Sequence, residues 1–288
     1  MIRRPPRSTL DRSSAASDVY KRQTTIPDSM AIFFLVILGA SFGSFLNVVI
    51  YRVPAKMSLV KPASHCGSCK TPIKPFDNIP ILSYFILGGK CRQCKDSFSN
   101  RYPLVEGLTA GLTVWLFIIF GINEKFFMYL ILTYLLIAIT FIDIDHFIIP
   151  NGFVLFGLAV LFIGLPMNWL PIEWVDGVSG AFVFAGFLFA IGLIGQFILK
   201  KESIGFGDIK LGLVLGGYLG VEYSVLALYL SFAISAIFVF IMLGSKMISK
   251  SQKIPFGPYL AGGTLLSILT TTPTGGNYIL DWYISTMF

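Results

Sequence analysis

FFMYLILTYLLIAITFIDIDHFIIPNGFVLFGLAVLFIGLPMNWL, residues 126–170, decides the fold class, because two apolar stretches meet there at one short acidic turn. Each stretch, 126–142 and 152–170, is close to the roughly 17 to 25 residues that a helix needs to cross a bilayer. The turn between them contains Asp143 and Asp145. A carboxylate beside a bilayer is energetically costly, so its presence between apolar spans indicates a functional site.

The same apolar pattern recurs along the chain. Its 288 residues are 55% hydrophobic and 13% charged, and the mean hydropathy is +0.76, which excludes an ordinary soluble domain. We therefore expect an all-α polytopic membrane protein with about eight transmembrane helices. They are expected near 31–50, 104–120, 126–142, 152–170, 178–199, 209–221, 223–244 and 256–272.

The expected organisation has four parts. Residues 1–29 form a tail and a short extracytoplasmic start, 30–51 the first span, 52–102 a polar insert, and 103–288 the rest of the membrane domain. Within the tail, residues 1–23 are rich in Arg and Ser and resemble translated adapter sequence, which makes Met30 the expected start; a signal or transit peptide is the alternative. This tail supplies +4 of the net charge of +7, so the charge indicates no nucleic-acid partner.

The basic residues predict the topology. Of the sixteen Lys and Arg beyond the tail, nine lie in 52–101 and three each in 200–210 and 246–253. Basic residues favour the cytoplasmic side, so we expect the insert, the 143–151 turn and the 200–208 loop to be cytoplasmic. Asp143 would then share one membrane face with Asp208.

All four cysteines lie in the polar insert, as two Cys-x-x-Cys pairs: Cys66, Cys69, Cys91 and Cys94. Two such turns can offer four thiolates at the corners of a tetrahedron, as in structural Zn²⁺ sites. We therefore predict a cytoplasmic zinc-binding domain whose small polar chain needs the metal to fold. A redox pair and four free thiols are the alternatives.

A second acidic position follows in GFGDIK, residues 205–210. Asp208 with Asp143 would form a pair of carboxylates sharing a proton, as in aspartic proteases. Gly205 and Gly207 would let an extended substrate approach closely. The alternative for each acid is a solvated helix end, with Asp208 at a favourable helix N-terminus and Lys210 as an interfacial anchor.

Several motifs occur in order from about residue 30 onward: GSFLNVVIYRVP at 43–54, the two cysteine pairs with NIPILSY at 78–84 between them, RYPLVE at 101–106, Asp143-x6-Pro150, GFGDIK, and PFGPYL at 255–260. Together they resemble the type IV prepilin peptidases, the bifunctional leader peptidase/N-methyltransferases of the GxGD aspartyl protease family. Asn151 stands where many relatives have Asp.

The resemblance implies a membrane aspartic endopeptidase of the bacterial inner membrane, acting in type IV pilus or type II secretion systems. It would cleave the short basic leader of prepilins or pseudopilins after a Gly and N-methylate the new N-terminus. The resemblance makes Asp143 and Asp208 catalytic, with Asp145, Gly205, Gly207 and Lys210 in support, and makes residues 103–288 the aspartyl peptidase domain.

The methyl donor implied by the resemblance is S-adenosylmethionine, for which Gly89 and Glu106 are weaker candidate binding residues. Glu106 has an alternative role as the ion-pair partner of Arg101 or Arg52. Two rival functions stay open: a transporter or assembly scaffold with a zinc-knuckle insert, and a peptidase without methyltransferase activity. A scaffold would tolerate Asn at both aspartates.

Overall fold

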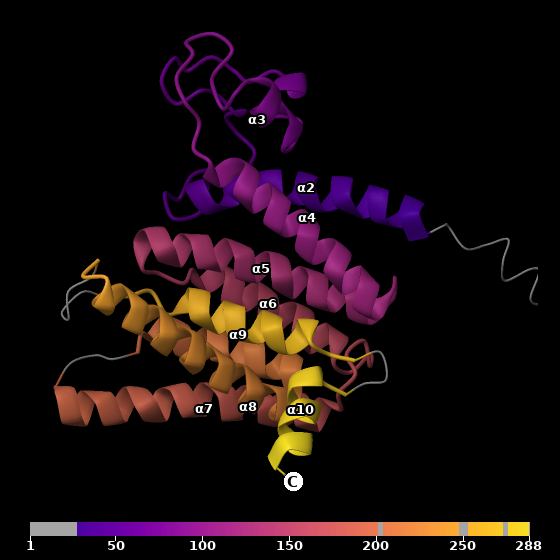
Figure 1. Cartoon of the computed structure of the whole chain (residues 1–288), viewed down its shortest axis with the longest axis vertical. Coiled ribbons are helices and arrows are strands. Elements are labelled where there is room, and N and C mark those ends of the chain that lie inside the picture. Colours follow the sequence, from indigo (N-terminus) through magenta and orange to yellow (C-terminus); the bar gives the residue numbers. More distant parts are fainter. Residues whose placement is uncertain (1–27, 201–203, 248–252, 273–275, 288) are drawn as a thin grey trace, which may run out of the picture.

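The computed structural model describes residues 28–200, 204–247, 253–272 and 276–287. Within these ranges the chain is helical, with isolated β-bridges and no strand. The predicted adapter-like segment, 1–23, lies outside the described residues. Figure 1 shows the helices stacked as a bundle, with the polar insert between α2 and α4 carried on one side of it.

The membrane domain is built from α2 (Asp28–Arg52), α4 (Arg101–Phe120), α5 (Glu124–His146), α6 (Asn151–Gly164), α7 (Trp174–Leu199), α8 (Phe206–Gly244) and α9 (Gly257–Leu269). A terminal helix, α10 (Tyr278–Met287), follows. Among the described residues, five helices are long and apolar enough to cross a membrane, namely α2, α4, α5, α7 and α8. The predicted class, an all-α polytopic membrane protein, is confirmed.

Two helices are shorter than the predicted spans. The α6 helix has 14 residues and α9 has 13, against predictions of 152–170 and 256–272. In α6 the sequence gives a reason, because Pro166 follows two residues after the last helical residue and has no N–H to continue the hydrogen-bond ladder.

The long helix α8 contains a backbone break at Gly220, whose φ is 71° and ψ −175°. Residues other than glycine rarely adopt this backbone conformation, and a Cβ at this position would lie 2.1 Å from Oδ2 of Asp176. The carboxylate of Asp176 instead accepts a 3.1 Å hydrogen bond from the N–H of Val221. At the break, the backbone N–H of Val221 is thus hydrogen-bonded by a side chain from α7.

The chain reverses direction at this break. Gly212 lies against Phe184 of α7, while the ring of Phe232 packs 5.9 Å from that of Phe187, one turn further along the same helix. In a straight helix, residues 212 and 232 would be about 30 Å apart. Both halves of α8 therefore run along α7 as a hairpin, which agrees with the prediction of two spans there.

The α5 helix occupies the middle of the bundle (Figure 1) and packs against α2, α4, α6 and α9. Its inner side chains, such as Leu136 and Ile139, are fully buried. Such burial of long apolar side chains fixes the helix rigidly, since protein interiors are close-packed. The last turn of α5 is where Asp143 lies.

The insert has little regular structure: a 3-10 helix, η1 (Pro75–Asn78), and a short α3 (Leu82–Ile86). At its start the buried side chain of Arg52 donates hydrogen bonds of 2.7 to 3.3 Å to three backbone carbonyls, those of Ser58, Leu59 and Pro62. These bonds fix the path of the chain as it leaves α2. The domain boundaries given above stay a prediction.

Candidate functional site

The two cysteine pairs of the insert have the same local backbone structure. The N–H of Cys66 donates to the carbonyl of Thr71 at 2.9 Å, and the N–H of Cys91 donates to the carbonyl of Asp96 at 2.8 Å. The fourth residue after each of these cysteines is left-handed, with φ of 59° and 60°. The chain thus forms one tight turn twice, and each turn presents two thiols.

The four thiols point at one common centre. Their sulfur atoms all lie within 4.8 Å of one another, and two cross-turn separations, Cys66–Cys94 and Cys69–Cys91, are 3.7 and 3.9 Å. A hydrogen bond with the side chain of Thr71 is the largest cause that lowers the pKa of Cys69 to about 6. The cluster could hold a metal ion.

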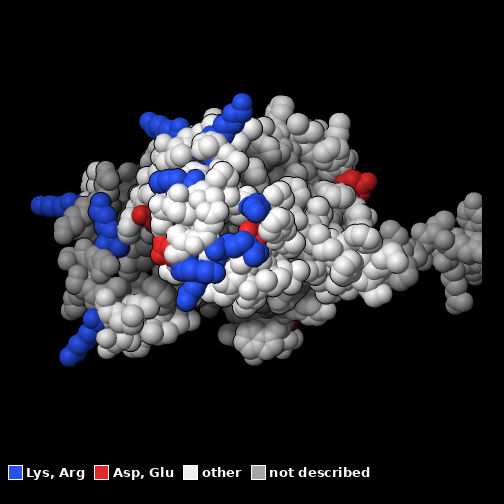
Figure 2. Space-filling view, turned by 90° about the horizontal axis from the view of Figure 1, so that it is seen from above, with Lys and Arg blue, Asp and Glu red and all other residues white. Residues whose placement is uncertain are grey.

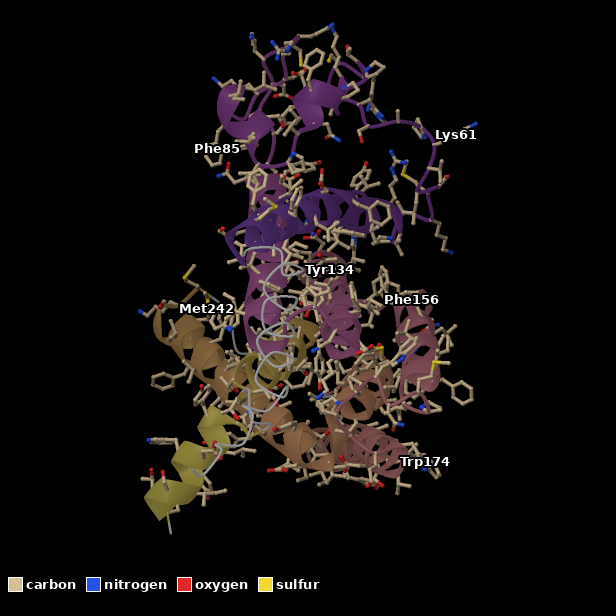
Figure 3. All side chains as sticks on the ribbon, turned by 90° about the vertical axis from the view of Figure 1, so that its right-hand side faces the viewer. Lys61, Phe85, Tyr134, Phe156, Trp174 and Met242 are labelled. Atoms are coloured by element: carbon tan, nitrogen blue, oxygen red, sulfur yellow. The ribbon has the colours of Figure 1, made fainter. Side chains whose placement is uncertain are left out.

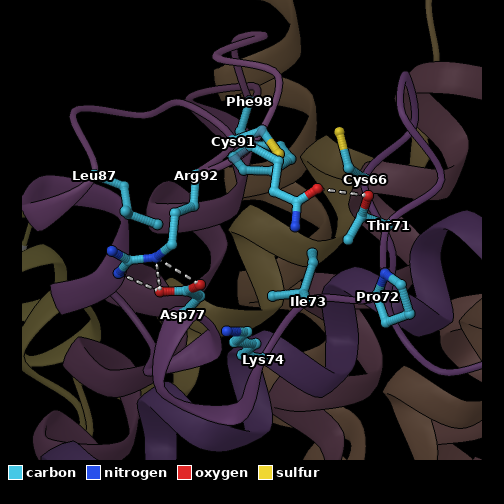
Figure 4. Close-up of a pocket in the computed structure, with 11 residues that line it drawn as sticks. Cys66, Thr71, Pro72, Ile73, Lys74, Asp77, Leu87, Cys91, Arg92 and Phe98 are labelled. Carbon is cyan, nitrogen blue, oxygen red and sulfur yellow. Dashed lines mark hydrogen bonds and ion pairs between the residues drawn. The ribbon is translucent and has the colours of Figure 1, made fainter.

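An ion pair fastens η1 to the second cysteine turn. The guanidinium of Arg92 donates to both carboxylate oxygens of Asp77, with Nη2 2.6 Å from Oδ1. Its hydrogen bonds lower the pKa of Asp77. Figure 4 shows this pair at one end of a cavity of about 80 Å³, which Cys66 and Cys91 line at the other. The cavity lies within the cysteine insert.

The two predicted carboxylates come together in the membrane domain. Asp143 is in the last turn of α5 and Asp208 in the first turn of α8, and they are only 5% and 8% exposed. Both line one cavity of about 290 Å³. Its other walls are mainly apolar side chains and glycine backbone: Phe147, Ile148, Ile149, Gly205, Phe206, Gly207 and Lys210.

Each carboxylate is held by one backbone N–H. Oδ2 of Asp208 accepts from Gly205 at 3.2 Å, which caps the first turn of α8, where Asp208 is the third residue. Oδ2 of Asp143 accepts from Gly257 at 2.9 Å, 114 positions away at the start of α9. A Cβ at Gly257 would be 2.7 Å from that oxygen. Gly257 lies in the motif PFGPYL, but the sequence pattern alone did not indicate its contact with Asp143.

Two supporting residues, Lys210 and Gly207, have contacts of their own. Lys210 donates to Oδ1 of Asn151 and its ammonium lies 5.1 Å from the Phe206 ring, so it joins the starts of α6 and α8. Gly207 packs closely, since a Cβ there would be 3.2 Å from the Cβ of Ile149. This contact gives Gly207 a packing role in addition to lining the cavity.

Asp145 turns away from the cavity, as expected two residues after Asp143. Its carboxylate pairs with Arg101, the first residue of α4. The same guanidinium donates to the carbonyl of Phe141 at 3.2 Å and lies 4.8 Å from its ring. Arg101 therefore contacts α5 two residues before Asp143 and again two residues after it.

Known families match most of the chain. Residues 37–120 match the bacterial peptidase A24 N-terminal domain, and residues 130–240 match the type IV leader peptidase family. A prepilin leader peptidase/N-methyltransferase of Pseudomonas aeruginosa is 35% identical over 259 residues, 81% of this chain and 88% of that protein. The chain belongs to the type IV leader peptidase family.

Further relatives of this family carry the same description. The protein of Aeromonas salmonicida is 36% identical over 285 residues, 88% of this chain and 94% of its own. The protein of Bacillus subtilis is 34% identical over 250 residues, which are 87% of this chain and 96% of that protein. No solved structure matches the chain. The resemblance inferred from the sequence motifs is confirmed.

In this leader peptidase family member, the two weaker cofactor candidates have structural roles. Oε2 of the buried Glu106 accepts a 2.7 Å hydrogen bond from the N–H of Ile81, just before α3. The expected alternative, an ion pair with Arg101 or Arg52, is wrong, because those guanidiniums bind Asp145 and backbone carbonyls instead.

Gly89 is also explained by packing. Its φ is +66°, and a Cβ there would lie 2.8 Å from the ring of Tyr84. Such a left-handed position beside an aromatic ring favours glycine. Together, Gly89 and Glu106 shape the insert around α3 and attach it to α4.

Proposed function

We propose that this protein is a membrane aspartic endopeptidase that removes the short basic leader of type IV prepilins or pseudopilins after a Gly and then methylates the new N-terminal amine. The observation that carries the peptidase reaction is the pair Asp143 and Asp208, buried on two different helices and lining one cavity. The relatives' common description, prepilin leader peptidase/N-methyltransferase, supports both activities.

The two carboxylates act as an acid/base pair. Two like charges in one poorly solvated cavity do not both ionise readily, so the pair holds one proton between them. The ionised member takes a proton from water as the water oxygen attacks the scissile carbonyl carbon. The protonated member donates a hydrogen bond to the carbonyl oxygen, and the pair then delivers a proton to the leaving amine.

The cavity suits a small, extended substrate segment. Gly205 and Gly207 leave its wall without side chains, so a substrate backbone can come close to Asp208. Phe147, Ile148 and Phe206 give apolar walls on which the hydrophobic helix that follows a prepilin leader can begin. Cleavage after Gly fits a position where a larger side chain has little room.

The cysteine cluster is proposed to bind one structural Zn²⁺. With Zn–S bonds of about 2.3 Å, the sulfurs of a tetrahedral site are about 3.8 Å apart. The observed separations of 3.7 and 3.9 Å fit that geometry. Cys66, Cys69, Cys91 and Cys94 would fill all four positions, so the ion would fold the insert and leave no site for substrate.

The second reaction would use S-adenosylmethionine as methyl donor, as the relatives' description suggests. The active-site end of the bundle is proposed to face the cytoplasm of a bacterial inner membrane. This orientation is supported by the excess of Lys and Arg in 52–101 beside that end, because cytoplasmic segments carry such an excess. A leader peptide synthesised in the cytoplasm then reaches Asp143 and Asp208 without crossing the bilayer.

The deciding experiment is prepilin cleavage in membranes that contain equal amounts of wild type, Asp143→Asn or Asp208→Asn. Wild type should release the leader, and neither variant should. Labelled S-adenosylmethionine in the same wild-type membranes should label the product and not the precursor. Cleavage by either variant would remove its aspartate from the mechanism, and cleavage without label would leave a peptidase that lacks the methyl-transfer step.

A further inference from the structure

The short helix α3 displays an apolar surface without a protein partner among the described residues. Leu82, Phe85 and Ile86 are 60%, 71% and 78% exposed. They occupy three of the five positions in the helix. Large apolar side chains that cluster on a surface indicate an interaction site, because contact with water is unfavourable for them.

The position of α3 relative to the membrane helices identifies what covers this surface. In Figure 1, α3 lies beside the length of α2 and does not extend beyond its Arg52 end. Figure 3, turned by 90°, shows the insert above α2, on the side away from the other helices, with Phe85 at its margin. Because α2 is long and apolar enough to cross a bilayer, the leaflet around its Arg52 end reaches the level of α3.

Two contacts with the start of α4 hold α3 at this level. Glu106 of α4 binds the N–H of Ile81, the residue before α3. The hydroxyl of Tyr84, within α3, donates to the side chain of Asn100, the residue before α4. The short helix is therefore attached to a membrane-crossing helix and does not hang from a free loop.

The charge of the surrounding insert favours the same partner. Residues 52–101 contain nine Lys and Arg but only two Asp. Figure 2 shows blue basic side chains gathered in the left and central part of the view, whereas the right-hand part is mostly white with one red acidic group. Basic residues beside an apolar surface match the anionic headgroups and acyl chains of a lipid leaflet.

We propose that α3 is an interfacial lipid anchor. Leu82, Phe85 and Ile86 insert among the lipids of the leaflet at the Arg52 end of α2, while the basic residues around them contact anionic headgroups. The apolar residues on the exposed side of α2, including Phe42 and Phe45, meet the same leaflet, so the lipid-facing surface continues from α2 to α3. The anchor fixes the height of the cysteine insert relative to the membrane.

A photoreactive phenylalanine analogue at Phe85 tests this proposal directly. The full-length protein, with the benzophenone side chain at position 85, is placed in vesicles of phosphatidylethanolamine and phosphatidylglycerol and irradiated. The same analogue at Gln93, an exposed residue of the second cysteine turn, is the matched control. We expect lipid adducts by mass spectrometry at position 85, at least about fivefold more than at position 93, with and without added prepilin.

Three results would overturn the anchor: no lipid adduct at position 85, equal adducts at positions 85 and 93, or a prepilin adduct that replaces the lipid adduct when substrate is added. The last result would make α3 a substrate-docking surface. Because labelling requires no catalysis, Asp143→Asn protein should label equally well. Failure of the proposed peptidase function would therefore leave the anchor measurement unchanged.

Discussion

The N–H of Gly257 donates a 2.9 Å hydrogen bond to Oδ2 of Asp143. This bond ties the start of α9 to the end of α5, and it reaches a carboxylate that is 5% exposed. Hydrogen bonds to ionised acceptors are stronger than neutral ones. Gly257 therefore orients Asp143 in the cavity that it shares with Asp208.

Gly257→Ala should reduce prepilin cleavage by about 100-fold, because small misplacements of a catalytic group have effects of that size. The new Cβ would be 2.7 Å from the carboxylate oxygen and would push it out of place. Gly262→Ala in the same helix is the control, since its Cβ would meet only the end of Ile234 at 3.9 Å. Initial cleavage rates at matched expression measure the difference, and equal rates for the two variants would contradict this role.

Arg101→Gln should lower kcat for prepilin about tenfold and leave KM nearly unchanged, because Arg101 contacts α5 on both sides of Asp143 without lining the cavity. A tenfold loss corresponds to about 1.4 kcal/mol of transition-state stabilisation. Asp145→Asn should have a similar effect, and the double variant should be no worse than the stronger single one.

Arg92→Gln is the control for Arg101, because it removes the ion pair with Asp77 inside the insert. Arg92 contacts neither Asp143 nor Asp208. Its cleavage rate should equal that of wild type. Additive losses in the Arg101 and Asp145 variants would show that the two residues act independently. That result would contradict the role of their ion pair in positioning α5.

Purified protein should contain one zinc per chain by elemental analysis, and Cys66→Ser should lose most of it together with thermal stability. Three thiolates form a weaker and less rigid site than four, and a metal that folds a small domain contributes to its stability. Methyl transfer should fall at least as much as leader cleavage, since the insert is separate from the aspartate cavity. Gln93→Ala, which keeps all four thiols, should retain the metal. A metal-free wild-type protein would end the zinc assignment.

Gly220→Ala should destabilise the membrane domain by about 1–3 kcal/mol or more, the range for a strained backbone position. The methyl group would meet Asp176, and the φ of 71° would be unfavourable for alanine. Gly186→Ala, a position on α7 with no atom within 4 Å of its Cβ, is the matched control. Thermal unfolding in detergent reads out both; equal midpoints would show that the hairpin does not need glycine at its turn.

The sequence predicts the features that depend on local pattern. Apolar length located the spans, including both halves of α8, and the Cys-x-x-Cys spacing predicted a cluster of four thiols. The meeting of Asp143 with Asp208 was predictable because charge placed both at one membrane face. The contacts that hold them were not predictable in the same way, since Gly257 and Arg101 reach α5 through packing between helices far apart in sequence. The expected ion pair of Glu106 with Arg101 or Arg52 was wrong for the same reason, because its contact with the N–H of Ile81 also depends on packing between separate segments.

The shortness of α6 and α9 has a consequence for the lipid around the cavity. With 14 and 13 residues they rise about 20 Å, against a hydrocarbon thickness of about 30 Å. Both begin beside the aspartates, at Asn151 and Gly257. Much of α6 is exposed, whereas α9 is mostly buried among other helices, so lipid meets α6, and we expect the bilayer to thin beside this short helix. Such thinning would bring the aqueous phase closer to Asp143 and Asp208, and the water used in hydrolysis would then have a shorter path to their cavity.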